Sequence, residues 1–220
     1  MIIVALPDIH DDVGRLGTVA EDLSTADLVL LVGDLTNFGR QAAAERIVRA
    51  VRKYNSRILA VPGNCDYPEV DAYLTREGIN LHRKSTLIDG IAFLGVGGSL
   101  PCPGRTPNEY SDRDFEAFLA EAASDLRPDA PVILISHQPP RNTVNDLAGI
   151  GRHVGSESVR AFIETVQPLL CFTGHIHEGR GMDSIGRTKV VNPGPLWTGN
   201  YAYARVSGNN AEVEVRLSSA

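Results

Sequence analysis

Short apolar runs alternate with longer amphipathic segments in the first part of the sequence. The apolar runs predict buried strands at Ile2–Leu6, Leu28–Val32 and Ile58–Val61. Helical spacing of apolar residues predicts helices at Val13–Leu23, Gln41–Lys53 and Glu69–Glu77. Strands that are separated by helix-length segments are typical of parallel strands joined by crossover helices. This part of the chain is therefore expected to form an α/β layer.

The pattern changes after residue 80. A hairpin is predicted around Asp89-Gly90, and a loop rich in Gly and Pro follows at Gly95–Pro107. Further helices are predicted at Asp112–Ala123 and Glu157–Val166, and further buried strands at Val132–Ser136 and Leu169–Phe172. The remaining apolar runs predict short antiparallel strands at Thr188–Val191, Tyr201–Val206 and Glu212–Leu217. We expect a single domain, residues 1–220, with two sheets and helices on the outside.

Composition and charge narrow the class of protein. Hydrophobic residues make up 43% and charged residues 22% of the chain, which is ordinary for a globular protein. A net charge of −6 argues against a surface built to bind nucleic acid. The three cysteines form no C-x-x-C pair, so neither a zinc ribbon nor a disulfide framework is expected. No signal-type stretch or membrane-length apolar run is visible, which favours a cytoplasmic protein without a membrane partner.

Polar side chains that can bind metal follow five of the apolar runs. In chain order they are Asp8 and His10, Asp34, Asn64, His137, and the pair His175 and His177. Because ligands bind beyond the carboxyl ends of strands in α/β sheets, these five strand ends are expected to converge. Alternation along an extended chain would point both polar members of Asp8-Ile9-His10, and of His175-Ile176-His177, the same way.

This set of side chains suits a centre with two divalent metal ions. Carboxylate and amide oxygens combined with imidazole nitrogens favour first-row divalent metals. Two such ions, about 3.5–4 Å apart, can share a water, lower its pKa and hold the oxygens of a phosphoryl group. Asp34 is the natural bridge, since Gly33 lets the backbone turn sharply before it. Each motif alone could be a helix cap or a turn as easily as a metal ligand. The ordered series of five motifs, however, is specific for a metal centre.

In order, the motifs are Asp-x-His, Gly-Asp, Gly-Asn-Cys-Asp, Ser-His and Gly-His-x-His, and they extend from Asp8 to the Asn192-Pro193-Gly194 turn. This series resembles the calcineurin-like metallophosphoesterase superfamily. The resemblance implies a four-layer α/β/β/α sandwich of two mixed sheets flanked by helices. It also implies hydrolysis of a phosphate ester by a hydroxide that bridges two metal ions.

Carried over position by position, the resemblance assigns each ligand. Asp8, His10 and His177 would hold the first ion, Asn64, His137 and His175 the second, and Asp34 would bridge them. The resemblance favours Mn²⁺, and Fe²⁺, Ni²⁺, Co²⁺ and Zn²⁺ suit the same ligands. The substrate would be a small-molecule phosphate ester.

One position departs from the commonest pattern of the family. Cys65 occupies the place where many members have a histidine that protonates the leaving group or holds the phosphate. Gly-Asn-Cys-Asp is similar to a branch of small prokaryotic phosphodiesterases, which favours a diester over a monoester substrate. A neutral thiol is a poor acid, so esters with good leaving groups should react best. Asp66 is then expected to orient neighbouring groups instead of pairing with a histidine.

Two loop residues are candidates for contacts with the substrate. His153 is a candidate catalytic acid or phosphate contact, and the competing interpretation is a loop histidine that packs against the next helix. Arg141 could contact substrate, against the alternative of a solvated loop arginine. The loops Gly95–Pro107 and Gln138–Val154 are expected to set the choice of substrate.

Other residues and functions stay open on the sequence. Trp197 and Tyr201 could line a pocket or belong to the core, as aromatics in terminal strands usually do. His82 is expected to be structural, and Cys102 and Cys171 to be ordinary small residues. A nuclease of the same superfamily and a non-catalytic scaffold are the competing functions. A scaffold should have lost metal ligands, whereas all seven positions are filled here. Self-association into a homo-oligomer is left open.

Overall fold

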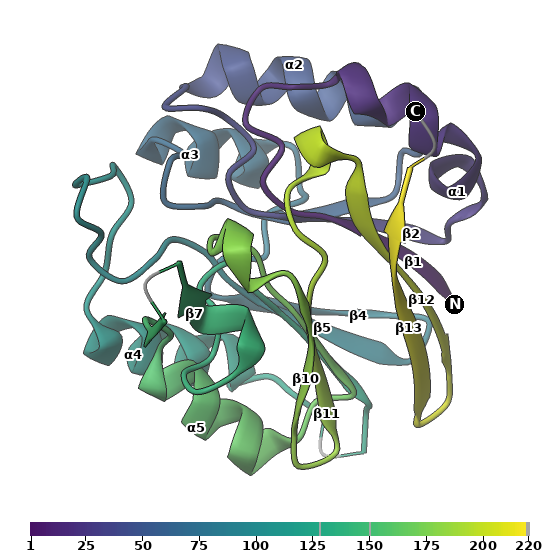
Figure 1. The fold of residues 1–220 in the computed structure, drawn as a ribbon. Helices are drawn as coiled ribbons and strands as arrows, with labels where there is room; N and C mark the ends of the chain where they lie inside the picture. The colour runs from purple at the N-terminus through teal and green to yellow at the C-terminus, as the bar shows by residue number, and fades with distance from the viewer. Residues whose placement is uncertain (128, 150, 219–220) are drawn as a thin grey trace.

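Two large β-sheets form the centre of the protein (Figure 1). The computed structural model describes residues 1–127, 129–149 and 151–218. The first sheet contains β1 (Ile2–Leu6), β2 (Leu28–Val32), β3 (Ile58–Val61), β12 (Asn200–Ser207) and β13 (Asn210–Leu217). The second contains β4 (Lys84–Ile88), β5 (Ile91–Val96), β6 (Val132–Ser136), β9 (Leu170–Phe172), β10 (Gly181–Ile185) and β11 (Thr188–Asn192). The strand orders are β13-β12-β1-β2-β3 and β10-β11-β9-β6-β5-β4.

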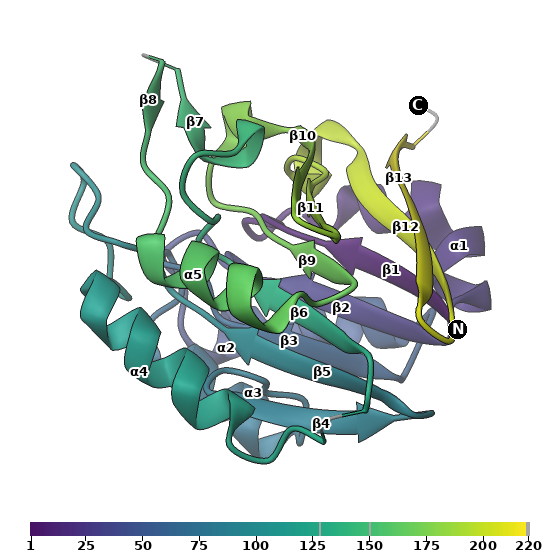
Figure 2. The ribbon, with the colours of Figure 1, turned by 90° about the horizontal axis from the view of Figure 1, so that it is seen from below.

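Helices cover the outer face of each sheet. The first sheet carries α1 (Ala20–Thr25), α2 (Gln41–Arg52) and α3 (Pro68–Arg76), and the second carries α4 (Asp112–Ala123) and α5 (Glu157–Val166) (Figures 1 and 2). Alternate residues of β1 show the layering, because Ile3 and Ala5 pack between the sheets while Val4 and Leu6 pack under the helices. A third apolar cluster joins the second sheet to α4 and α5. This is the four-layer α/β/β/α sandwich that the resemblance implied.

The strands that precede the ligand motifs run parallel within each sheet. β1, β2 and β3 are parallel neighbours, and so are β5, β6 and β9. Burial on both faces explains their continuous apolar sequences. β1 lies inside its sheet, between β2 and the antiparallel strand β12. The parallel order brings the carboxyl ends of β1, β2 and β3 to one edge of the first sheet.

The structure differs from the predicted elements in three places. Val13–Leu23 is not one α-helix but the 3₁₀ helix η1 (Gly14–Val19) followed by α1, because Gly14 and Gly17 disfavour α-helix in its first half. Strand β10 was not predicted, since its Gly-Met-Asp-Ser-Ile sequence has no apolar run. A small hairpin of β7 (Leu147–Ala148) and β8 (Arg152–His153) projects from the sheets (Figure 2).

Four residues that belong to predicted segments lie outside the described residues. Residue 150 belongs to the predicted loop Gln138–Val154, and residues 128, 219 and 220 belong to the predicted single domain. No helix among the described residues combines the length and the apolar character that a membrane crossing requires.

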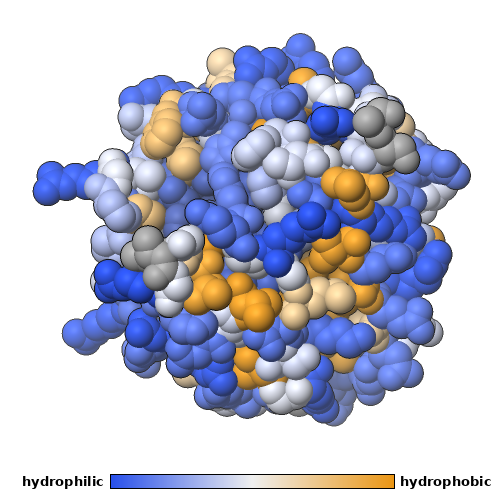
Figure 3. Space-filling model, viewed as in Figure 1, coloured by the Kyte–Doolittle hydropathy of each residue, from blue (hydrophilic) through white to orange (hydrophobic). Residues whose placement is uncertain are grey.

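The exposed hydrophobic side chains are mostly dispersed. Figure 3 shows one face on which hydrophobic residues form small groups within a largely hydrophilic surface. Large exposed hydrophobic residues include Phe38, Leu87, Val144, Leu147, Val154, Met182, Trp197 and Leu217. Scattered exposure of this kind is normal for a folded protein and does not by itself mark an interface.

Candidate metal centre

Tight turns after five strands bring the seven predicted ligands together. Four of the seven have a left-handed backbone, with φ of 51° at Asp8, 47° at His10, 47° at Asp34 and 66° at His175. Non-glycine residues rarely adopt positive φ, and such strain is concentrated at functional sites. The common orientation of Asp8 and His10 thus comes from a strained turn after β1 and not, as predicted, from alternation along an extended strand.

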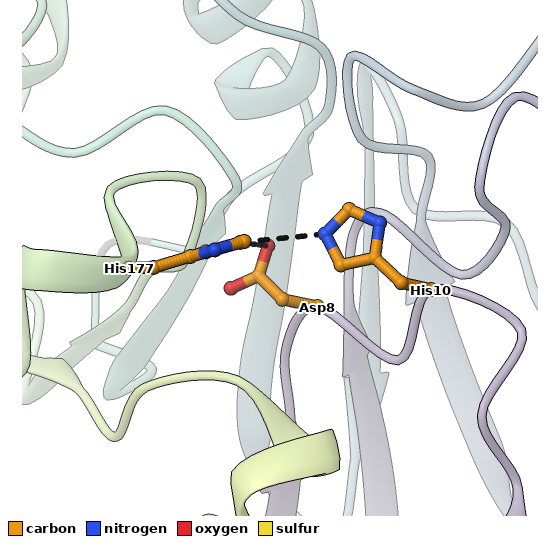
Figure 4. A group of neighbouring side chains, drawn as sticks. All are labelled: Asp8, His10 and His177. Atoms are coloured by element: carbon orange, nitrogen blue, oxygen red, sulfur yellow. Dashed lines mark hydrogen bonds and ion pairs between the residues drawn. The ribbon is translucent and has the colours of Figure 1, made fainter.

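The first group of predicted ligands is Asp8, His10 and His177, whose ligand atoms the structure brings within 4.8 Å of one another. Figure 4 shows the ring of His177 pointing toward that of His10 beside the Asp8 carboxylate, and the two ring planes meet at 76°. The two Nε2 atoms are 3.3 Å apart, and His177 Nε2 is 3.7 Å from Asp8 Oδ1. Ligand atoms that each lie about 2.1 Å from one ion are separated by about 3–3.5 Å, so this group can hold a metal ion.

Asp8 supplies a further sign that a cation belongs here. Its side chain is fully buried, and its Oδ2 has no hydrogen-bond partner among the described residues. Burying a carboxylate oxygen without a partner is costly. The backbone N–H of His175 donates to the other oxygen, Oδ1, at 3.2 Å. The free oxygen is thus available to a metal ion in the same cluster.

The second group contains Asn64, His137 and His175. His137 Nε2 lies 3.0 Å from Asn64 Oδ1, and the ring centroids of His137 and His175 are 5.3 Å apart. His137 Nδ1 donates a hydrogen bond to the carbonyl of Val32 at 2.8 Å. That bond fixes the ring and leaves Nε2 as the nitrogen that faces the site, as is usual for a histidine that binds metal.

Asp34 lies between the two groups. Its Oδ2 is 3.6 Å from His10 Nε2, and its Oδ1 is 3.5 Å from His137 Nε2. Two glycines permit this approach: a Cβ on Gly33 would lie 2.2 Å from the His137 ring, and a Cβ on Gly63 would lie 2.1 Å from the backbone nitrogen of Asp34. Any larger residue at these positions would push the ligand-bearing turns apart.

Charges in the cluster compensate one another. Burial alone would raise the pKa of Asp34, but the neighbouring His137 and His10 lower it well below its usual range. Burial opposes protonation of His137 too, yet the Asp34 carboxylate raises the pKa of His137 to about 9. Burial and the charge of His137 lower the pKa of His175 to about 4. Near pH 7 and without metal, Asp34 is therefore ionised, His175 is neutral and His137 is protonated. A metal ion that binds His137 must displace its proton, because histidine binds metal in the neutral form.

The neighbours of Asn64 hold the turns in place. Asp66 is fully buried and accepts four hydrogen bonds, from the backbone N–H groups of Gly63, Leu35 and Thr36 and from the Thr36 hydroxyl. It therefore links the turn after β2 to the turn after β3.

The thiol of Cys65 faces the cluster, with its sulfur within 4.8 Å of the ligand atoms of His10 and Asp34. Burial, followed by the charge of Asp34, raises the pKa of Cys65, which keeps the thiol neutral. Cys65 is therefore a neutral group beside the His10 imidazole and the Asp34 carboxylate.

Two contributors to the site escaped the sequence analysis. Cys102 lies on the predicted Gly/Pro-rich loop, and its sulfur is 3.6 Å from His175 Nε2, so it is not merely an ordinary small residue. Gln138 is fully buried, accepts from the backbone N–H of Leu100 and donates to the carbonyl of Val154. It ties the two predicted substrate loops together directly after His137. Neither residue belongs to a recognisable motif.

The remaining candidates lie outside the ligand cluster. His153, on β8, donates from Nδ1 to the buried carboxylate of Asp146 at 2.7 Å. No hydrogen bond or ion pair among the described residues joins His153 to the seven ligands. Arg141 forms an ion pair with Glu157 at 3.5 Å. Roles for both residues in contacts with the substrate therefore stay predictions.

Three residues of undecided role are also placed. Tyr201 is buried in the core, whereas Trp197 is exposed and contacts His177 edge-on. His82 is buried and structural, as predicted: its Nδ1 accepts a hydrogen bond from the backbone N–H of Gly97.

Comparison with known proteins agrees with this geometry. The chain is 38% identical over 200 residues to the uncharacterized protein MJ1162 of Methanocaldococcus jannaschii, covering 89% of this chain and 88% of that protein. It is 28% identical to a probable cyclic nucleotide phosphodiesterase of Synechococcus, over 71% of this chain and 61% of that protein. The crystal structure of TT1561 of Thermus thermophilus superposes with a TM-score of 0.76 at 24% identity, over 97% of each chain, and so shares the fold.

A family model also matches most of the chain. Residues 1–179, which include all seven predicted ligands, match the model of the calcineurin-like phosphoesterases. The fold with helices outside two sheets and the convergence of Asp, His and Asn turns at one edge agree with that match. The chain therefore belongs to the calcineurin-like phosphoesterase family.

Proposed function

We propose that this protein is a metal-dependent phosphodiesterase with a dinuclear centre. The observation that carries the proposal is the position of Asp34, whose two carboxylate oxygens face different histidines, His10 on one side and His137 on the other. A carboxylate placed in this way can bind two ions at once. The unpartnered Oδ2 of Asp8, and the ring nitrogens of His10 and His177 that meet beside the same carboxylate, support a cation on the first side.

The protein's own groups would divide the work as follows. Asp8, His10 and His177 would hold one ion, Asn64, His137 and His175 would hold the other, and the two oxygens of Asp34 would be shared between them. Divalent ions, when bound, supply Lewis acidity and lower the pKa of a water bound to them, so that hydroxide is available at neutral pH. The protein keeps the ligands aligned: Val32 orients His137, and Asp66 holds the turns that carry Asp34 and Asn64. Mn²⁺ is the metal we propose.

The preference for a diester rests on the similarity of the Gly-Asn-Cys-Asp motif to that of small prokaryotic phosphodiesterases. The same cysteine bears on the leaving group. Cys65 stands where a histidine would protonate the departing oxygen, and its neutral thiol is a weak acid. Esters whose leaving groups need little protonation should therefore react fastest. The probable cyclic nucleotide phosphodiesterase of Synechococcus, which resembles this chain, is named for a diester activity and supports the same preference.

A direct test measures hydrolysis of bis-p-nitrophenyl phosphate and p-nitrophenyl phosphate. Metal-stripped protein is compared with protein supplied with Mn²⁺, and Asp34→Asn serves as the matched variant with nearly unchanged shape. We expect metal-dependent turnover, faster for the diester, that falls at least 100-fold in the variant. Metal analysis should find two ions per chain in the wild type. Turnover that is independent of metal, or one ion per chain at saturation, would contradict the dinuclear mechanism.

A further inference from the structure

A single exposed tryptophan lies beside the ligand cluster. Trp197 is the only tryptophan in the chain, and 44% of its surface is exposed. Exposing a large aromatic ring to water is unfavourable, and most aromatic residues in this part of the chain, such as Tyr201 and Tyr203, are buried. The exposed indole is therefore not explained by packing of the core.

The backbone fixes the position of this side chain. Trp197 is the middle residue of the 3₁₀ helix η4 (Leu196–Thr198). Leu196, directly before it, is fully buried in the core and donates its backbone N–H to the carbonyl of Pro7 at 3.2 Å. Pro7 immediately precedes Asp8. The segment that carries the indole is thus tied to the turn that carries the first ligand.

The ring lies against another ligand of the same group. The centroid of the Trp197 ring is 6.1 Å from that of His177, and the two rings meet at 72°. An edge-on contact of this kind covers only part of the indole, and 44% of the surface of Trp197 stays exposed. His177 is itself only partly covered, with 38% of its side chain exposed. Both rings therefore border the accessible side of the first metal group.

We propose that Trp197 is a specificity residue that stacks on an aromatic or heterocyclic group of the phosphate ester. This inference rests on the proposed function, because it assumes that the phosphate binds at the ligand cluster. A phosphate held beside His177 would carry its organic group toward the indole, whose ring centroid lies 6.1 Å from that of His177. Aromatic groups gain from stacking on indole, whereas small alkyl groups do not. The substrate class is accordingly an ester of a nucleoside or of another ring-bearing alcohol.

The test uses two phosphonates that are not hydrolysed, so that binding is measured apart from catalysis. Calorimetric titrations of Mn²⁺-loaded protein compare phenylphosphonate with methylphosphonate. The proteins are the wild type, Trp197→Ala, Trp197→Phe and, as a control, Leu87→Ala, which truncates a similarly exposed side chain on edge strand β4. Tryptophan fluorescence of the wild type gives a second readout, since every tryptophan signal belongs to Trp197.

We expect the wild type to bind phenylphosphonate about tenfold more tightly than methylphosphonate. Trp197→Ala should bind the two about equally, Trp197→Phe should keep most of the preference, and Leu87→Ala should keep all of it. Phenylphosphonate should also quench or shift the tryptophan fluorescence more than methylphosphonate does.

Two results would overturn the inference. One is a preference for phenylphosphonate that survives in Trp197→Ala. The other is an equal loss of both ligands in that variant together with a lower Mn²⁺ content, which would make Trp197 a support for His177 only. Failure of the proposed function gives a different result. The wild type would then show no metal-dependent hydrolysis of the p-nitrophenyl esters, whereas the role of Trp197 is measured separately by the phosphonate titrations.

Discussion

Replacing His82 with asparagine isolates one source of acid sensitivity that does not involve the ligand cluster. His82 is buried, and its Nδ1 accepts a hydrogen bond from the backbone N–H of Gly97 at 2.8 Å. Its ring stacks on Tyr110 and meets Phe118 edge-on. Burial in this aromatic setting lowers the pKa of His82 from 6.5 to about 4. The Oδ1 of an asparagine can accept from Gly97, but it cannot titrate in this range.

The size of the effect follows from proton binding in the two states. Above pH 6.5 His82 is neutral whether the chain is folded or not, so it makes no contribution to pH dependence. Between pH 6.5 and about 4 the unfolded chain binds a proton that the folded protein excludes, and stability falls as the pH falls. The free energy of unfolding should decrease by about 2 kcal/mol between pH 7.5 and pH 5, and by about 3 kcal/mol near pH 4.

Urea denaturation of the wild type and of His82→Asn, at pH 7.5 and at pH 5, measures this decrease. Both proteins are kept in excess chelator, so that titration of the metal ligands contributes equally and cancels in the difference. The variant loses ring packing and should be less stable at pH 7.5 by about 1–2 kcal/mol. That gap should shrink by about 2 kcal/mol at pH 5. A gap that stays constant across the two pH values would refute the reasoning.

Three further substitutions test the site. Cys65→His supplies a stronger acid and should raise kcat/KM for a cyclic nucleotide, relative to bis-p-nitrophenyl phosphate, by about tenfold or more at unchanged metal content. Asp66→Asn removes acceptors for buried N–H groups, so calorimetry should find metal affinity lowered about 10- to 100-fold and denaturation a loss of about 3 kcal/mol. Gln138→Leu cuts the link between the two predicted substrate loops and should raise KM more than it lowers kcat. Gln138→Glu, which keeps the acceptor for the Leu100 N–H, is the comparison. Equal effects of both variants on kcat and KM would contradict a positioning role.

The layers and the metal-binding turns could be predicted from sequence because both depend on local patterns. An apolar run followed by Asp, His or Asn identified the ends of β1, β2, β3, β6 and β9. The reason that Asp8 and His10 point into one site could not be predicted in this way, because alternation along a strand has a visible period whereas a left-handed turn at a non-glycine residue has none. The structure brings the predicted residues together, but through left-handed turns and not through the predicted alternation.

Contacts between distant segments were beyond the sequence for a different reason. Gln138 meets Leu100 and Val154, and Cys102 meets His175, through loops whose paths are set only by the finished fold. Trp197 was assigned with Tyr201 to either a pocket or the core, and nothing in the local sequence distinguishes the exposed ring from the buried one. The cytoplasmic location, the choice of Mn²⁺ and a homo-oligomer stay predictions, as do contacts of His153 and Arg141 with the substrate.

The central place of β1 in the first sheet has a consequence for how the chain folds. Its two neighbours are made at very different times: β2 follows within about 30 residues, whereas the backbone bond from Met1 to Val206 of β12 joins positions 205 residues apart. During synthesis β1 therefore has an unpaired side for most of the time that the ribosome is at work. Pairing over such a separation is slow, and an unpaired strand edge is prone to join other chains. Chains that stop before β12 should consequently aggregate, even though they contain every predicted metal ligand.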